Sequence, residues 1–241
     1  MIDLKKLNQD GYSYTNVVLD NKVLKSMQAA ISCRVDKNID IKLKNDNFMM
    51  VNQPFLIKPF LDVALMDQIL MIPFLFFQGR EFYLGTCNLR RSVSTKVPET
   101  TTTVYHRDRN LGSLQETKNN FLKVFIYLTD VGLENGPFTY CAGSQNKVLE
   151  NLADYRVPDK TVADLYPNKE VFLTGSAGTI LTANTTGLHK GTKVREGYRD
   201  MFTINYCTTP EKGATNFIIK KEEYKALPEQ KQTMCKYLGV R

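Results

Sequence analysis

Val104-Tyr105-His106-Arg107-Asp108 is the stretch of the sequence from which its fold and chemistry are best interpreted. In an extended strand, side chains two residues apart point to the same face. The imidazole of His106 and the carboxylate of Asp108 are therefore within reach of one metal ion. A His-x-Asp pair also arises often by chance, as a surface or hydrogen-bonded pair, so the pair by itself does not establish a metal site.

The second histidine strengthens the metal hypothesis. His189 is the only other histidine of the chain, 81 residues after Asp108 (189 − 108) and just past the end of a predicted strand. Two imidazoles and one carboxylate, with coordination positions left open, form the facial triad typical of non-haem Fe(II) oxygenases. Arg199 follows ten residues later (199 − 189) in another strand-like run. Its guanidinium can grip the carboxylate of a keto acid in bidentate fashion.

The second half of the chain has the pattern of a β-sandwich or barrel, with short apolar runs separated by glycine and polar turns. The predicted strands cover residues 81–89, 100–106, 122–128, 138–141, 171–174, 179–183 and 200–207. We expect a mainly β fold with flanking helices, a cupin-like jelly roll or double-stranded β-helix, with the metal between its two sheets. A single domain, 1–241, is predicted. Its parts are helical and edge-strand support (1–80), the jelly-roll core (81–209) and a C-terminal tail (210–241).

The most apolar stretch, residues 60–77, is not expected to cross a membrane. Asp62, Asp67 and Pro73 interrupt it before the roughly 20 uninterrupted residues that a bilayer requires. A buried helix that starts at Pro59 and is broken near Pro73 is predicted instead, backing the main sheet.

Composition sets further limits. A hydrophobic fraction of 42% supports a folded core. Five scattered cysteines without a Cys-x-x-Cys pair indicate reduced thiols, and the N-terminus shows no export signal, so a cytoplasmic protein is expected. The net charge of +7 is compatible with an anionic substrate, with nucleic acid, or simply with solubility.

Basic residues near the predicted ligands favour an anionic substrate. Arg107 and Arg109 flank Asp108, Lys190, Lys193 and Arg195 follow His189, and Arg90-Arg91 end a strand expected to run nearby. In the predicted fold these residues share the mouth of one pocket, and Arg107, Arg109 and Arg195 are expected to contact a phosphate or carboxylate of the substrate. A solvated rim with no binding role is the alternative. The polar segment 109–120 is a candidate to cover the metal when substrate arrives, with inert surface as the equal alternative.

These motifs resemble the signature of the Fe(II)/2-oxoglutarate-dependent oxygenases, and within them the phytanoyl-CoA dioxygenase-like family. The resemblance rests on His106-x-Asp108, His189, Arg199, the strand 122–131, the Asn135-Gly136-Pro137 turn and Gly143-Ser144. It runs from about Gly85 to Thr208. Ala142 and Gln145 stand where that family usually has proline and histidine, and these departures concern the sub-family and not the metal ligands.

The resemblance implies an enzyme, a dioxygenase that hydroxylates a small, anionic organic substrate and releases succinate and carbon dioxide. It implies Fe(II), 2-oxoglutarate as co-substrate and O2, with ascorbate as an optional reductant. Arg199 would hold the distal carboxylate of 2-oxoglutarate. Approximate alignment with the family adds Asn88 and Phe125 as co-substrate contacts, with plain core positions as the equal alternative. Lys123 is set aside because it does not share the face of Val124.

Three alternatives remain open at this point. A zinc hydrolase would use two histidines, an aspartate and water, but it would leave Arg199 without a role. A non-catalytic metal-binding cupin would bind a metabolite without turnover. A 2-oxoglutarate oxygenase acting on nucleic acid or protein would suit the positive charge, but the sequence has no aromatic-plus-basic stacking run. Neither the substrate nor the oligomeric state is predicted.

Overall fold

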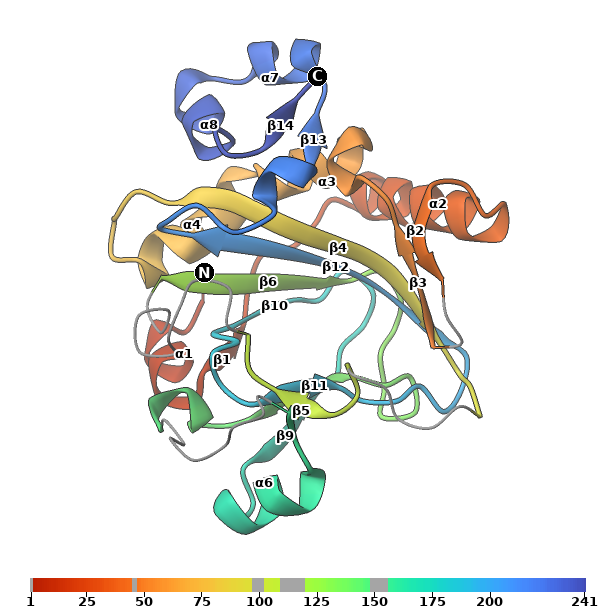
Figure 1. The fold of residues 1–241 in the computed structure, drawn as a ribbon, viewed down its shortest axis with the longest axis vertical. Helices are drawn as coiled ribbons and strands as arrows, with labels where there is room; N and C mark the ends of the chain where they lie inside the picture. The colour runs from red at the N-terminus through yellow and green to blue at the C-terminus, as the bar shows by residue number, and fades with distance from the viewer. Residues whose placement is uncertain (1, 45–46, 97–101, 109–119, 148–155) are drawn as a thin grey trace.

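Two facing β-sheets form the core of the structure (Figure 1). The computed structural model describes residues 2–44, 47–96, 102–108, 120–147 and 156–241. The large sheet has the strand order β1-β10-β6-β12-β4-β3-β2. Its strands are β1 (Tyr12–Tyr14), β2 (Ile41–Lys44), β3 (Phe48–Val51), β4 (Tyr83–Val93), β6 (Phe121–Tyr127), β10 (Ile180–Ala183) and β12 (Tyr198–Cys207).

The small sheet has the strand order β8-β5-β11-β7-β9, and neighbouring strands in both sheets are antiparallel. Its strands are β5 (Tyr105–His106), β7 (Phe138–Cys141), β8 (Arg156–Val157), β9 (Glu170–Leu173) and β11 (His189–Gly191). The predicted double-stranded β-helix is confirmed. The predicted strand 100–106 is too long: residues 102–104 form a turn and bend, and 100–101 lie outside the described residues.

The large sheet is apolar on both faces. Along β6, Val124 and Ile126 pack into the cluster under the helices, whereas Phe125 and Tyr127 pack into a second cluster between the two sheets. A strand that is buried on both sides needs no alternation of apolar and polar residues. This is why β6 reads as a continuous apolar run, with Lys123 as its one charged residue.

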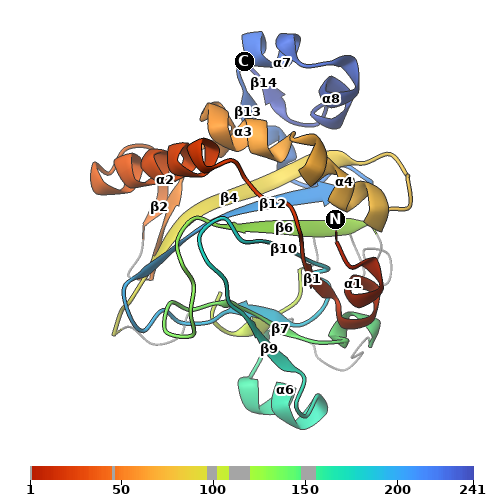
Figure 2. The same cartoon turned by 180° about the vertical axis from the view of Figure 1, so that it is seen from behind.

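Three helices cover the outer face of the large sheet: α2 (Asn21–Asp36), α3 (Lys58–Ala64) and α4 (Asp67–Phe76) (Figure 2). The ring of Phe60 on α3 meets that of Phe202 on β12 edge to face, with centroids 4.9 Å apart. The hydroxyl of Tyr206 donates to the carbonyl of Ala64 at 2.7 Å. At the start of α2, Asp20 accepts a hydrogen bond from the backbone of Lys22 and caps the helix, as its sequence position predicts.

The predicted helix 59–73 is wrong in one respect: it is two helices that meet at Leu65 and Met66, and Pro73 lies inside the second. A proline removes one backbone hydrogen bond within a helix. Here α4 continues past Pro73 for only three residues, to Phe76, so the proline lies in the last turns of the helix. Among the described residues no single helix is long and apolar enough to span a membrane; only α3 and α4 taken together, bent by 42°, meet that test.

Shorter elements complete the chain. They are α1 (Leu4–Asp10), α6 (Asp159–Leu165), α7 (Lys221–Ala226), α8 (Glu229–Met234), β13 (Ile218–Ile219), β14 (Gly239–Val240) and the 3-10 turns Pro54–Leu56, Ser144–Asn146 and Ala214–Asn216. Pro228 directly precedes α8, and α6 begins after Pro158. Residues 148–155 lie outside the described part of the chain.

Candidate metal centre

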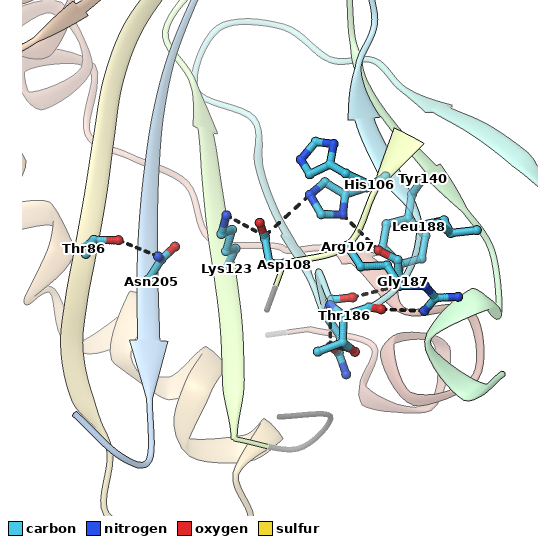
Figure 3. Close-up of polar contacts among 12 residues, drawn as sticks. Thr86, His106, Arg107, Asp108, Lys123, Tyr140, Thr186, Gly187, Leu188 and Asn205 are labelled. Carbon is cyan, nitrogen blue, oxygen red and sulfur yellow. Dashed lines mark hydrogen bonds and ion pairs between the residues drawn. The ribbon is translucent and has the colours of Figure 1, made fainter. Parts of the chain in front are cut away.

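The strand pairing of the small sheet brings the two histidines together. β5 and β11 are antiparallel neighbours, and His189 lies directly opposite His106. Their ring centroids are 4.4 Å apart. Asp108 follows β5, where its backbone N–H donates to the carbonyl of Thr185 at 2.9 Å. Figure 3 shows His106 and Asp108 in the space between the two sheets.

Ligand atoms of all three side chains converge on one point. One ligand atom from each of His106, Asp108 and His189 lies within 4.8 Å of the other two. Nε2 of His189 is 3.5 Å from Oδ2 of Asp108. The structure thus brings together the three residues that the sequence suggested, and we refer to them as the triad.

Backbone carbonyls fix the protonation of both imidazoles. Nδ1 of His106 lies 2.9 Å from the carbonyl of Val104, and Nδ1 of His189 lies 2.9 Å from that of Gly187. A carbonyl only accepts, so each Nδ1 carries the proton and each Nε2 keeps its lone pair. In metal-bound histidines, the ring nitrogen that does not bind the metal usually donates a hydrogen bond that fixes the orientation of the ring.

The charges of the triad suit a cation. Burial, and then the neighbouring His106, lower the pKa of His189 to about 3. Burial also lowers the pKa of His106. For Asp108, burial alone would raise the pKa, but the ammonium of Lys123 and the two imidazoles outweigh it and hold the pKa below its usual value. Two neutral imidazoles and one carboxylate fit a divalent metal ion, and iron(II) takes this ligand set.

Lys123 is a member of the site that the sequence interpretation missed. Its Nζ lies 2.7 Å from Oδ2 of Asp108, and both side chains are largely buried. The approach is ionic and not a well-directed hydrogen bond, because Oδ2 has no hydrogen-bond partner among the described residues. The parity argument correctly separated Lys123 from Val124. The face of Val124, however, is the one under the helices, and the opposite face carries the site (Figure 3).

We expect Lys123→Met to destabilise the metal-free protein by about 1 to 2 kcal/mol, because the buried carboxylate of Asp108 loses its nearest cation. A bound metal ion would replace that cation, so the metal-loaded variant should lose less. The rise in melting temperature on adding Ni(II) should therefore be larger for the variant than for the unmodified chain.

The control for this measurement is Lys231→Met, which removes an ion pair with an exposed carboxylate, Asp67. That variant should leave the Ni(II)-induced shift unchanged. Equal shifts for Lys123→Met and the unmodified chain would contradict the role assigned to Lys123.

A cavity of about 230 Å³ opens beside the triad. Asn88 from β4 and Phe125 from β6, which the alignment suggested as co-substrate contacts, both line it. The ring of Phe138 also lines it and lies 5.5 Å from that of His189. The cavity therefore combines the ligand set with an aromatic wall.

Arg199 lies behind this cavity and not at its surface. The residue is on β12, is 2% exposed, and lines a small adjoining cavity of about 20 Å³. Nη2 donates to the hydroxyl of Ser92 at 3.4 Å, whereas Nε and Nη1 are buried without a partner among the described residues. A buried guanidinium with idle donors is suited to bind an anion.

The arginines predicted to contact the substrate lie elsewhere. Arg107 is 5% exposed and donates to the backbone carbonyls of Ser144, Thr186 and Lys147, at 3.0, 2.6 and 3.1 Å. The side chain of Arg195 is 72% exposed and pairs with Glu134 at 3.6 Å.

Neither of these arginines is among the residues that line the cavity beside the triad. The expectation that these arginines share the mouth of the pocket is therefore wrong for the described cavity: Arg107 holds three backbone carbonyls and Arg195 lies at the surface. Arg109 and the predicted covering segment, apart from Asn120, lie outside the described residues.

Comparison with known proteins agrees with this fold. The family model for phytanoyl-CoA dioxygenase (PhyH) matches residues 61–195. The solved structure of the epimerase SnoN with Fe3+, alpha ketoglutarate and nogalamycin RO is 16% identical, with a TM-score of 0.65, and covers 85% of this chain and 81% of its own. HygX from Streptomyces hygroscopicus, with nickel and 2-oxoglutarate, is 14% identical, with a TM-score of 0.64 and 85% of each chain covered.

EctD from S. alaskensis, with 2-oxoglutarate and 5-hydroxyectoine, is 17% identical, with a TM-score of 0.62 and coverage of 85% of this chain and 74% of its own. At these identities the likeness shows the fold alone. No curated protein sequence matches the chain.

Proposed function

Because the chain belongs to the phytanoyl-CoA dioxygenase family, whose model spans more than half of its residues, we propose that it is an iron(II)- and 2-oxoglutarate-dependent dioxygenase. Its reaction would hydroxylate a small organic substrate. The observation that carries the proposal is the convergence of His106, Asp108 and His189 on one point beside a cavity. Structural neighbours with 2-oxoglutarate and iron or nickel support it.

The overall reaction balances simply. Substrate, 2-oxoglutarate and O2 give hydroxylated substrate, succinate and carbon dioxide. Iron(II) held by the triad supplies the redox chemistry that couples decarboxylation to oxidation of a C–H bond. Asp108 supports hydroxylation over halogenation, because it keeps a carboxylate at the position that halogenating relatives leave open.

The remaining residues bind and shield. His106, Asp108 and His189 would hold the iron(II), which would supply the chemistry of 2-oxoglutarate and O2. Arg199 would attract the distal carboxylate toward the back of the cavity, since its idle N–H groups need an acceptor. Phe125 and Phe138, with ring centroids 4.3 Å apart, exclude water from one side of the cavity.

The anionic character of the substrate is part of the proposal. Among the described residues that line the cavity, Arg90 and Lys123 are cationic and Asp108 is the only acid. This basic lining favours organic anions, 2-oxoglutarate among them. The expectation of an anionic substrate rests on this lining, and Arg107 and Arg195 lie outside it.

The test is turnover with purified protein, Fe(II), ascorbate, 2-oxoglutarate and air, across a panel of small carboxylates and phosphate esters. We expect iron-dependent succinate formation above the uncoupled background, and a product heavier by one oxygen atom. Zinc in place of iron should give no succinate. Hydrolysis of a substrate with zinc would support the rival zinc hydrolase instead.

Binding without turnover of 2-oxoglutarate would favour a non-catalytic metal-binding cupin. Oxidation of oligonucleotides or peptides would favour the nucleic-acid- or protein-modifying alternative. Residence in the cytoplasm stays a prediction.

A further inference from the structure

Arg90 lies between the triad and Arg199. It is on β4, opposite Met201 of β12, and faces the space between the sheets. Arg90, like Phe48, Thr102 and Gly191, lines both the cavity beside the triad and the small cavity that reaches Arg199. Among these residues Arg90 is the one cation.

The two guanidiniums meet over one glycine. Gly191 is two residues beyond His189 on the same strand. A Cβ atom added there would lie 3.3 Å from Nη2 of Arg199 and 3.4 Å from Nη2 of Arg90. The missing side chain leaves room for both cations, and we call Arg90 and Arg199 the arginine pair. Residues two apart on a strand share a face, so Gly191 lies on the same face of β11 as His189, and Lys190 on the other. The arginine pair therefore lies on the triad's face of β11.

The arginine pair lacks a counter-ion in the part of the chain that the structure describes. Nε of Arg90 and two nitrogens of Arg199 are buried without a hydrogen-bond partner. The face of the Arg90 guanidinium stacks on Phe48, 5.4 Å from the ring centroid, which leaves its N–H edge to bind. Burial, and then the charge of Arg199, lower the pKa of Arg90 to about 9.

The neighbouring arginine of the same strand shows the contrast. Arg91 points to the other face of β4, where Nε and Nη2 donate to the two carboxylate oxygens of Asp200 at 2.8 and 2.7 Å. Two adjacent arginines of one strand thus have opposite environments, one neutralised and one not. Cations with buried N–H groups are normally paired, so the arginine pair, which has no counter-ion among the described residues, has the chemistry of an anion site.

We propose that Arg90 binds the distal carboxylate of 2-oxoglutarate together with Arg199, and that the arginine pair selects keto acids with a second carboxylate. This inference rests on the proposed function. Two guanidiniums offer one carboxylate charge-assisted hydrogen bonds from both sides. Arg90 is the member of the pair that lines the triad's cavity, so it approaches the distal carboxylate from the cavity side. Arg199 approaches the same carboxylate from the small adjoining cavity.

The experiment measures binding to Ni(II)-loaded protein by calorimetry, without turnover. The probes are 2-oxoglutarate and 2-oxopentanoate, which has the same chain length but no distal carboxylate. Arg90→Met should weaken 2-oxoglutarate binding by about 10- to 100-fold, the range for lost charged hydrogen bonds. It should change 2-oxopentanoate binding by no more than about twofold, because that ligand makes no contact with the arginine pair.

Arg90→Lys should retain part of the affinity for 2-oxoglutarate, since it keeps the charge but loses the fork geometry. The matched control is the exposed Arg195→Met, which should bind both acids as the unmodified chain does. Equal weakening of both acids by Arg90→Met would indicate a merely structural role and overturn the inference.

A second measurement uses the metal-free protein. Arg90→Met removes a partly buried cation that lies beside Arg199 and loses its stacking on Phe48, and relief of the charge repulsion should still raise the melting temperature by about 2 to 4 °C. A lower melting temperature would mean that Arg90 already has stabilising partners inside the protein, which contradicts a site that awaits an anion.

The two proposals fail in different ways. Failure of the unmodified Ni(II)-loaded chain to bind 2-oxoglutarate would overturn the proposed function and this inference together. Tight binding by the unmodified chain and equally tight binding by Arg90→Met would overturn the inference alone.

Discussion

His189→Ala should weaken the binding of Fe(II) or Ni(II) by at least about 100-fold and reduce succinate formation to background. Mutation of a residue that only hydrogen-bonds to a metal ligand lowers metal affinity by about 10- to 100-fold, so loss of a ligand itself should lower the affinity further. The variant keeps only His106 and Asp108, and two ligands do not hold a divalent ion in a site of this kind. The fold should persist, because the backbone pairing of β11 with β5 and β7 does not depend on the imidazole.

Metal content after dialysis and a Ni(II) titration by calorimetry measure this effect. Asp62→Ala is the control, since Asp62 is half exposed on α3 and its one ion pair among the described residues is with Lys58. It should bind metal as the unmodified chain does. Retention of stoichiometric, tight metal by a folded His189→Ala protein would show that the triad is not the metal site.

Arg107→Met should lower the free energy of unfolding by about 3 kcal/mol. Three backbone carbonyls, in Ser144, Thr186 and Lys147, each lose a charged donor, and buried acceptors left without partners are costly. The residue stands between His106 and Asp108 in the sequence, so its loss should also loosen the triad and weaken metal binding.

Chemical denaturation measures the first effect and Ni(II) titration the second. Arg195→Met is the matched control: the side chain is exposed, and its removal should change the unfolding free energy by no more than about 0.5 kcal/mol. If Arg107→Met were as stable as the control but bound substrate poorly, the original prediction of a substrate contact would return.

The sequence predicts the fold and the ligand set because both depend on local patterns. The strands 122–128 and 138–141 lie within one residue of β6 and β7, since apolar runs between glycine turns mark buried strands. The His-x-Asp spacing and the following histidine are explicit in the sequence.

The environment of each cation was not predictable in the same way. Lys123 and Arg90 lie in strands of the large sheet and Arg107 directly follows β5. Sequence does not reveal which face of a strand that is covered on both sides meets the metal. Arg90 and Arg91 are neighbours in sequence, yet only the pairing of β4 with β12 places Asp200 beside Arg91. Partners that come from across a sheet are a tertiary property.

The pairing of β5 with β11 has a consequence for how the protein acquires its metal. A chain that is still being synthesised presents His106 and Asp108 long before His189 has been added. Non-local strand pairing is slow because a long loop must close before any contact forms. Metal capture therefore follows sheet assembly, and adding metal during refolding should raise the final yield of stable protein without accelerating the folding step.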